Sequence, residues 1–391
     1  MDGPDSVAGV FPDLPPRLLG YCLKPDAFVT GNRLTLLRDG RQAYPAMLEA
    51  IASARSSVHL ETYILSDDKT GRTFAQALAG RARAGVPARL IFDSIGSLEL
   101  GEGFLQNLRN AGVQVLEYHP VAPWRRRWGW GRRDHRKTLV VDGRVGFAGG
   151  INITDDYADP EQGGGGWHDF HVRVEGPAAH ELDRQFRGVW FKETGRFFTL
   201  AEPAGEPPGS SLVHVAANQE FLKRFFIRKA ILHAIDRARR RIVIASAYFI
   251  PDRGLRKAFV KACRRGVAID VLLPAVSDVA AANYASRRLF KSHLDAGLRL
   301  HLHPGRVLHA KAMVVDRAWA AVGSYNITHR SLLHNLETNL HIVDPDFAGR
   351  LEDELLSDVR GAKELLPEIW DSRPLSERLL ERVFYWLRHW F

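Results

Sequence analysis

Two short stretches of this sequence carry the same reactive side chains at the same spacing. The first, "HRKTLVVDGRVGFAGGIN", covers residues 135–152, and the second, "HAKAMVVDRAWAAVGSYN", covers residues 309–326. Each begins with His-x-Lys, continues through an apolar run to Asp, and ends in Gly, then Gly or Ser, then x-Asn. A single His-x-Lys is typical of an ordinary surface strand, but two copies with the same trailing residues predict a duplicated reactive site.

The chemistry that these residue types allow is phosphodiester transfer. Residues i and i+2 of a strand point to the same face, so His135 is expected beside Lys137, and His309 beside Lys311. One histidine can attack as a nucleophile while the other protonates the leaving oxygen and then deprotonates the acceptor, and the lysines neutralise the phosphate oxygens. The sequence therefore predicts a covalent phosphohistidine with no cofactor. It predicts no metal either, because no carboxylate or His/Cys cluster has metal-ligand spacing.

The trailing turns are expected to bind the phosphate. Gly150, Asn152, Ser324 and Asn326 stand at matching places after the two apolar runs. Side-chain amides and the backbone N–H groups of small-residue turns can together hold an anionic tetrahedral centre.

Four acids accompany the motifs. Asp142 and Asp316 complete the motif and belong to the candidate catalytic set, yet their odd offset from the histidines turns them to the opposite strand face, so we expect them to anchor the turns. Asp169 and Glu337 follow the two motifs at matching places. A neutral histidine nucleophile needs a carboxylate on its other ring nitrogen, so these two are predicted to orient the histidines; as single residues they would be surface charges.

An internal repeat surrounds the motifs. Residues 47–60 align with 231–244 as a helical pattern, a basic turn and a strand, and residues 77–93 align with 258–274 as a helix, a Gly-Val turn and a buried strand. Helices and strands alternate, which predicts an α/β fold made of two pseudo-twofold related α/β/α sandwich halves with mixed sheets. The active site would lie at their interface.

The repeat also predicts how the chain is divided. A segment rich in Pro, Gly and Ser separates the two copies, as in a linker. The expected parts are an N-terminal extension (1–31), a first half (32–200), a linker (201–211), a second half (212–372) and a C-terminal amphipathic helix (373–391).

The composition is that of an ordinary globular protein. Of the 391 residues, 45% are hydrophobic and 25% are charged. Only two cysteines occur, far apart, which excludes a disulfide framework. The formal net charge of +9 fits anionic lipid and nucleic acid about equally well. The sequence shows no signal-peptide layout and no run of 18 or more apolar residues, so a lipid substrate would be approached from the membrane surface.

The doubled motif resembles the phospholipase D superfamily, over about residues 32–372. The stretches "GGINITDDY", "WHDFHVRVEGPAAHELDRQF" and "AYFIP" resemble its bacterial cardiolipin synthase branch. The resemblance implies a metal-independent, two-step transfer of a phosphatidyl group from phosphatidylglycerol to a second phosphatidylglycerol or another alcohol. It also implies that His135 is the nucleophile and His309 the general acid/base. A lipid hydrolase or a phosphatidylserine-type transferase would differ only in the acceptor, and a nuclease of the superfamily would use the same histidines.

Two features depart from the branch pattern. Its typical members begin with two transmembrane helices, which this sequence lacks, so we expect a subgroup without them. Such a protein would act peripherally on the cytoplasmic face of the bacterial inner membrane, and no obligate protein partner is implied.

In the second motif Thr328 stands where the branch usually has an acid, which removes the expected partner of Arg330.

An aromatic and basic stretch before the first motif is a candidate membrane contact. Residues 123–137, "PWRRRWGWGRRDHRK", interleave Trp124, Trp128 and Trp130 with arginines. Aromatic side chains beside cations suit a lipid headgroup layer. They equally suit single-stranded nucleic acid, which stacks its bases on aromatic rings. An anionic phospholipid is the expected partner, and nucleic acid is not.

The last stretch of the sequence is a second candidate. On a helix, residues 377–391 place Trp386, Trp390 and Phe391 on an apolar face, and Glu381 with several arginines on the other face. Such a helix either lies in a membrane interface or packs on the core or on a partner chain.

Overall fold

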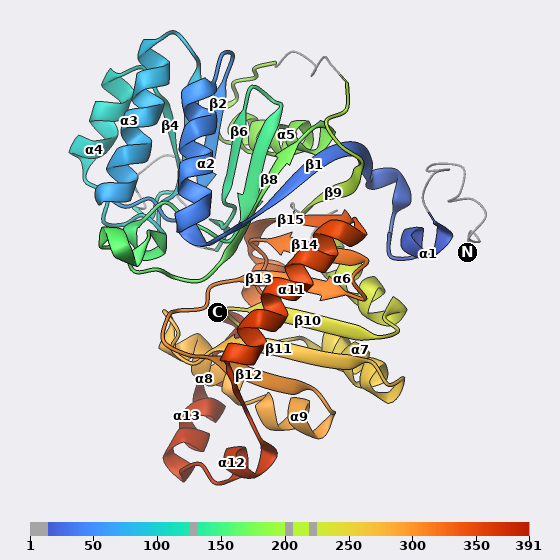
Figure 1. The fold of residues 1–391 in the computed structure, drawn as a ribbon. Helices are drawn as coiled ribbons and strands as arrows, with labels where there is room; N and C mark the ends of the chain where they lie inside the picture. Colours follow the sequence, from blue (N-terminus) through green and yellow to red (C-terminus); the bar gives the residue numbers. More distant parts are fainter. Residues whose placement is uncertain (1–14, 123, 125–130, 200–205, 219–224, 391) are drawn as a thin grey trace.

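The computed structural model describes residues 15–122, 124, 131–199, 206–218 and 225–390. Its strands form one continuous mixed sheet (Figure 1). The strand order is β16-β12-β11-β10-β13-β14-β15-β9-β1-β8-β7-β6-β2-β3-β4, and β5 pairs with β15 at the side.

The first half holds the first motif. Its elements are β1 (Val29–Arg38), α2 (Asp39–Ser53), β2 (Val58–Thr62), α3 (Lys69–Arg83), β3 (Ala88–Asp93), α4 (Glu102–Asn110), β4 (Gln114–Tyr118), β5 (Arg133–Asp134), β6 (Thr138–Val141), β7 (Val145–Gly149), η3 (Asp155–Tyr157), η4 (Pro160–Gln162), β8 (Phe170–Glu175) and α5 (Pro177–Thr194).

The second half repeats this order. Its elements are β9 (Ser211–Asn218), α6 (Phe226–Arg237), β10 (Arg241–Ser246), α7 (Arg253–Arg264), β11 (Ala268–Pro274), α8 (Ala280–Arg287), α9 (Phe290–Asp295), β12 (Arg299–His303), β13 (Lys311–Val315), β14 (Trp319–Gly323), α10 (His329–Leu333), β15 (Asn335–Val343), α11 (Pro345–Gly361), β16 (Lys363–Glu364), α12 (Pro367–Asp371), α13 (Leu375–Trp386) and η5 (Arg388–Trp390).

The two halves have the same internal topology. In the first, β2, β3 and β4 are parallel and β6, β7 and β8 follow as antiparallel neighbours. In the second, β10, β11 and β12 are parallel and β13, β14 and β15 are antiparallel. The predicted α/β fold of two related halves is therefore confirmed, with one difference: β9 and β1 join the two sheets edge to edge into one.

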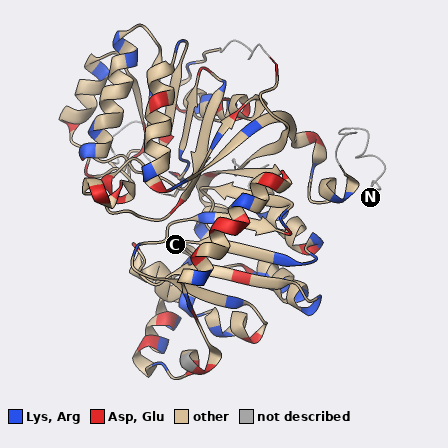
Figure 2. Cartoon of the chain, viewed as in Figure 1, with Lys and Arg blue, Asp and Glu red and all other residues tan. Residues whose placement is uncertain are grey.

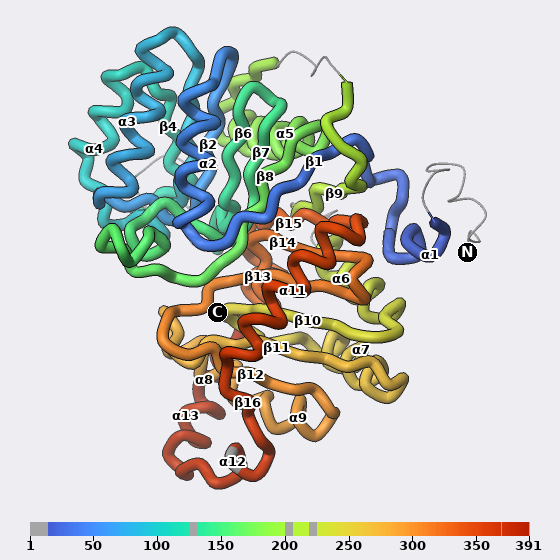
Figure 3. The backbone as a smooth tube through the Cα atoms, viewed as in Figure 1, coloured from blue at the N-terminus to red at the C-terminus, as the bar shows by residue number. Residues whose placement is uncertain are grey.

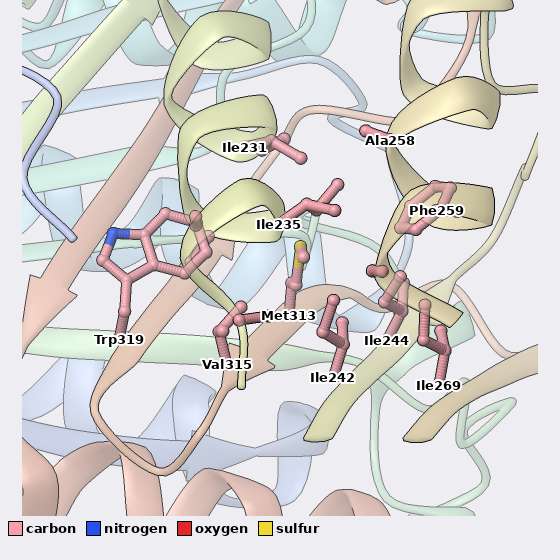
Figure 4. Close-up of a cluster of buried hydrophobic side chains, with 14 of the residues drawn as sticks. Ile231, Ile235, Ile242, Ile244, Ala258, Phe259, Ile269, Met313, Val315 and Trp319 are labelled. Carbon is pink, nitrogen blue, oxygen red and sulfur yellow. The ribbon is translucent and has the colours of Figure 1, made fainter. Parts of the chain in front are cut away.

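Helices cover both faces of each half. In the first half, α2, α3 and α4 pack on one face of the sheet and α5 packs on the other. In the second half, α6 and α7 cover one face and α11 covers the other. Figure 4 shows the core under α6 and α7, where Ile231, Ile235 and Phe259 meet the strand residues Ile244 and Met313.

The repeated Gly-Val turn ends two equivalent helices. Gly85 after α3 and Gly266 after α7 both have φ of +84°, the left-handed conformation that glycine adopts without steric cost. In each turn the N–H of the following valine donates to the carbonyl five residues earlier, which is the Schellman arrangement. This local signal fixes where the next strand begins.

The segment before β1 belongs with the second half in space. Leu18, Leu19 and Phe28 are buried in the core cluster that contains α6 and α7, and the ring of His233 on α6 lies 2.9 Å from the carbonyl oxygen of Gly20. The chain then crosses through β1 into the first half (Figure 3).

Candidate active site

Each His-x-Lys segment is attached to a strand of the opposite half. The N–H of His135 donates to the carbonyl of Leu336 in β15 at 3.0 Å, and the N–H of His309 donates to the carbonyl of His168, just before β8, at 2.8 Å. The two bonds are equivalent under the internal repeat. They bring both histidines to the junction of the two halves.

The residue after each of these carbonyls is a predicted orienting acid, so each acid meets the histidine of the other half. Nδ1 of His135 lies 3.0 Å from Oε2 of Glu337, and Nδ1 of His309 lies 2.8 Å from Oδ2 of Asp169. In the sequence each acid follows the motif of its own half. Strand pairing across the junction places it beside the histidine of the other half. Both contacts use Nδ1, which leaves Nε2 as the nitrogen available for chemistry.

The lysines lie beside their histidines, as strand alternation predicts. Nζ of Lys137 donates to the carbonyl of His135 at 2.7 Å and lies 5.1 Å from the centre of the Tyr63 ring. Nζ of Lys311 lies 3.0 Å from Nε2 of His309. All four motif side chains are buried, so two cations and two imidazoles share an environment with little water.

Burial sets the protonation of this group. Burial lowers the pKa of His135 to about 4, although Glu337 opposes the shift. Burial also lowers the pKa of His309 well below its usual value, and Lys311 adds to the effect. Burial lowers the pKa of Lys137 to about 7 and that of Lys311 to about 8. Both imidazoles are therefore neutral at pH 7, and Nε2 of His135, whose Nδ1 faces Glu337, carries the lone pair for attack.

The two orienting acids differ in charge. Burial alone would raise the pKa of Glu337, but His135 and Lys137 hold it below its usual value. Burial raises the pKa of Asp169 to about 7 even though Lys311 opposes the shift. Glu337 is thus ionised at neutral pH, while the carboxyl of Asp169 takes up a proton in the same pH range.

Sequence reasoning missed two tyrosines of the site. The hydroxyl of Tyr157 lies 2.8 Å from Nδ1 of His309 and accepts a hydrogen bond from Nδ2 of Asn152 at 3.0 Å. The ring of Tyr63 stands edge-on to the His135 ring, with centroids 4.9 Å apart. Tyr157 ends the stretch "GGINITDDY", which carries the family resemblance, and that signal could have identified it.

The predicted phosphate-binding N–H groups are used within the sheet, so that prediction is corrected. The N–H of Gly150 donates to the carbonyl of Phe170 at 3.1 Å, and the N–H of Ser324 donates to the carbonyl of Thr338 at 2.9 Å. A Cβ at position 150 would lie 2.2 Å from Oδ2 of Asp169. Gly150 therefore makes room for the orienting carboxylate instead of binding phosphate.

The two asparagines are placed differently. Oδ1 of Asn152 accepts the N–H of Ile64 at 3.1 Å, and its Nδ2 is bound to Tyr157. Asn326 is also buried, but its Oδ1 has no hydrogen-bond partner in the part of the chain that the structure describes. Of the two, Asn326 keeps an unpaired amide oxygen, which can accept a hydrogen bond.

The motif aspartates lie at the far end of the hairpins. Asp142 accepts hydrogen bonds from the N–H groups of residues 55–57 before β2, and Asp316 accepts them from residues 239–241 before β10. Both residues have φ of +55°. Their inclusion in the catalytic set is corrected: strand alternation turns them away from the histidines, and they tie the hairpin turn to the neighbouring loop.

A buried charged network, which sequence reasoning also missed, lies behind the first motif. Five of its side chains are at most 1% exposed: Glu61, Asp93, Arg133, Asp134 and Arg136. Nη1 of Arg136 lies 3.7 Å from Oε1 of Glu61, and the N–H of Asp134 donates to Oδ2 of Asp93 at 2.8 Å. Three of its members, Arg133, Asp134 and Arg136, flank His135 directly in the chain.

Thr328, which replaces the usual acid, caps α10. Its Oγ1 accepts the N–H of Ser331 at 3.3 Å. Arg330 donates instead to the carbonyl oxygen of Trp390 at 3.1 Å. The substitution therefore leaves Arg330 bound to the last turn of the chain.

The predicted membrane contacts are exposed where they are described. Trp124 is 85% exposed, Trp386 is 77% exposed and Trp390 is 73% exposed. Trp128, Trp130 and Phe391 lie outside the described residues. Within the described residues, no group of three or more His, Cys, Asp or Glu side chains could hold a metal ion.

Comparison with known proteins gives a consistent family match. The family model described as "Cardiolipin synthase, PLD-like domain" matches residues 47–190 and 231–359. Cardiolipin synthase A of Pseudomonas putida is 35% identical over 345 residues, which is 87% of this chain and 71% of that protein. Cardiolipin synthase of a Geobacillus species is 32% identical over 365 residues, 92% of this chain and 72% of that protein.

Solved structures share the fold at low sequence identity. Phosphatidylserine synthase of Haemophilus influenzae matches with a TM-score of 0.67 and 14% identity, covering 91% of this chain and 95% of that one. Polyphosphate kinase of Porphyromonas gingivalis matches with a TM-score of 0.54 and 15% identity, covering 83% and 50%.

Proposed function

The chain belongs to the cardiolipin synthase family of phospholipase D-like proteins, and on that premise we propose that it transfers a phosphatidyl group from phosphatidylglycerol to a second phosphatidylglycerol or another alcohol. The observation that carries the proposal is the pair of buried histidines, each held at Nδ1 by a carboxylate of the other half. Two oriented imidazoles supply the nucleophile and the proton donor that such a transfer requires.

In the first step, Nε2 of His135 attacks phosphorus. The P–N bond forms, the P–O bond to the glycerol headgroup breaks, and His309 gives its Nε2 proton to the leaving oxygen. The imidazole of His135 becomes cationic, and the ionised Glu337 on its Nδ1 stabilises that charge. Asp169 takes up a proton near neutral pH, and its carboxyl passes that proton to Nδ1 of His309 as Nε2 gives its own proton to the leaving oxygen, so His309 stays neutral.

In the second step, the acceptor hydroxyl gives its proton to His309 and its oxygen attacks phosphorus. The P–O bond forms, the P–N bond breaks, and His135 returns to its neutral form. Lys137 and Lys311 neutralise the phosphate oxygens in both steps. An anionic phosphate beside these buried lysines raises their pKa again, because an opposite charge favours the protonated form.

Association with an anionic membrane surface is part of the proposal. Within the described residues, none of the helices has the length and apolar content needed to cross a bilayer. The proposed site of action is the cytoplasmic face of the bacterial inner membrane, where phosphatidylglycerol supplies both substrate and negative surface charge. Exposed Trp124, Trp386 and Trp390 support this placement.

The test is to incubate the purified chain with phosphatidylglycerol vesicles in excess EDTA and to identify the products by mass spectrometry. Cardiolipin and glycerol are the expected products, and the H135A variant is the inactive control. Phosphatidic acid alone would assign a hydrolase. Activity that EDTA removes and Mg²⁺ restores would overturn the two-histidine mechanism.

A further inference from the structure

In helix α13 the two acidic side chains face inward, while apolar side chains are exposed. Glu381 is fully buried, bound to Arg373 at 2.9 and 2.7 Å. Glu377 is paired with Arg287 of α8, and the ring of Phe384 stacks on that of Tyr284 with centroids 5.7 Å apart. Glu381, which the sequence places on the charged face, is therefore turned inward together with Glu377, because Arg287 of α8 and Arg373 supply their partners.

The opposite face is an exposed apolar stripe. It consists of Leu375, Leu379, Val383, Trp386 and Trp390. Their spacing follows the helical period, so they form one continuous row along α13 and η5. A helix of a globular protein normally buries such a row, and a contiguous exposed apolar patch marks a surface that contacts another body.

The end of the stripe contacts the segment that follows the second motif. Arg330, four residues after Asn326, donates to the carbonyl of Trp390, and the ring of His329 lies 4.8 Å from that of His389. The last turn of the chain therefore packs beside α10, which follows the second motif.

Further exposed apolar side chains come from loops at the same edge of the sheet. Lys137 directly precedes β6, whose Thr138 pairs with Glu61 near the carboxyl end of β2, so the catalytic groups lie at the carboxyl ends of the parallel strands. The loops that leave this edge after β3, β4 and β11 carry exposed Leu98, Trp124, Val276 and Val279. In Figure 1, α8 and α13 lie together on the side of the second half where β11 ends.

We propose that this stripe, with the strand-end loops, docks on the surface of an anionic phospholipid bilayer and holds the active-site mouth at headgroup level. The inference rests on the proposed function, because a lipid substrate must enter at that edge. Charge selects the occupant: Arg382 and His389 are exposed beside the stripe, whereas Glu377 and Glu381 are paired inward. Figure 2 colours the basic and acidic residues along the whole chain. Trp and Leu enter the interface while the arginines meet phosphate groups.

The test substitutes the stripe without removing the tail, because the inner face packs on α8. The variant W386S/W390S is compared with F191S/F197S, a control that removes two exposed aromatics at the end of α5. We expect sedimentation with phosphatidylglycerol-containing vesicles to fall by about tenfold or more in the stripe variant alone, given the apolar area of two tryptophans. Transfer on vesicles should fall with it, and transfer on a short-chain, monomeric phosphatidylglycerol should be unchanged.

A second variant tests the same surface without removing an apolar side chain, which separates lost docking from local misfolding. R382E changes only an exposed charge, and it should weaken binding to anionic vesicles at low salt but not at high salt, where surface charges are screened. Unchanged vesicle binding in W386S/W390S and in R382E would overturn the proposal. The proposal would also fail if the wild type were a dimer in sedimentation velocity and W386S/W390S were a monomer that still bound vesicles. The stripe would then contact a second copy of the chain. If the wild type binds vesicles but transfers nothing on either substrate, the proposed function fails while the docking surface stands.

Discussion

The layers behind the two histidines are built from opposite kinds of side chain. Behind His135 lies the network of buried carboxylates and guanidinium groups, whereas the equivalent positions behind His309 are apolar. Glu61 pairs with Thr138 across the sheet, and Ala245 pairs with Ala312 at the same place in the second half. By the motif offset, the first-half residues Arg133, Asp134 and Arg136 correspond to Val307, Leu308 and Ala310.

The two halves therefore share their reactive groups but differ in the residues that support them. The second half shows that this fold closes with an apolar layer at these positions. Buried charges are costly unless they are paired, so the first-half network is not required for burial itself. It distinguishes the segment carrying the proposed nucleophile from the segment carrying the proposed acid/base.

The largest expected effect separates the two histidines. H135A should abolish transfer and leave no phosphatidyl adduct on the protein, because the attacking nitrogen is gone. H309A should slow turnover by about 10²–10⁴-fold, the usual worth of a general acid/base, and still permit the adduct. Intact-protein mass spectrometry after an alkaline quench, which spares acid-labile phosphohistidine, measures this. An adduct on H135A but not on H309A would reverse the assigned roles.

The next largest effect concerns the charged layer. R136A leaves buried carboxylates without their guanidinium and should lower the free energy of unfolding by about 3–5 kcal/mol. The double variant E61A/R136A installs the alanines found at positions 245 and 310 of the second half. It should cost less than the sum of E61A and R136A by about 1 kcal/mol or more, because the two side chains interact.

Urea unfolding of the four proteins in this double-mutant cycle measures that coupling. A310G, directly before β13 in the second half, is the control, and it should cost only about 0.5–1 kcal/mol, the usual penalty of glycine relative to alanine. Additive effects of E61A and R136A would mean that the two charges do not stabilise each other.

A third effect depends on pH and concerns His168, which occupies the position of Leu336 in the second half. Its Nδ1 lies 2.5 Å from Oδ1 of Asp39 and its Nε2 lies 2.9 Å from Oδ2 of Asp358. The side chain lines a cavity of about 540 Å³. Burial opposes protonation, but the two carboxylates raise the pKa of His168 from 6.5 to about 9. The folded value lies above the unfolded value, so the stabilisation is complete below pH 6.5 and disappears as pH rises through 9.

Replacing His168 by leucine, the second-half residue, should therefore remove about 3 kcal/mol of stability at pH 6, from a shift of this size at 1.36 kcal/mol per pKa unit. The difference between wild type and H168L should shrink steadily toward pH 10. Thermal or urea unfolding across that pH range measures it. A difference that stays constant with pH would show that the histidine acts by shape and not by charge.

The smallest effect compares the two small-residue turns. S324G installs the glycine of the first half and removes one hydrogen bond to Glu337, so kcat should fall by about tenfold or less, given about 1.5 kcal/mol for a hydrogen bond to a charged group. G150S makes the reverse change and should be far more damaging, since its Cβ would meet the Asp169 carboxylate. Steady-state kinetics on a soluble substrate checks both, and equal losses would contradict the comparison.

Much of the site follows from local rules in the sequence. Strand alternation places Lys137 beside His135 and turns Asp142 away, and both features depend on neighbours two to seven residues apart. The Gly-Val turns likewise set the boundaries of α3 and α7. The network around Arg136 could not be predicted in this way, because its members come from separate strands and each has an ordinary composition around it.

Local patterns in the sequence predict the two sets of reactive side chains, the face on which each lies, and the order of helices and strands around them, because all of these depend on backbone periodicity. Strand pairing across the junction of the halves sets the partners of the histidines, Glu337 for His135 and Asp169 for His309. Tertiary contacts also use the N–H of Gly150 within the sheet and turn Glu377 and Glu381 of α13 inward. Partners distant in the chain set these outcomes, and no local pattern encodes which partner arrives.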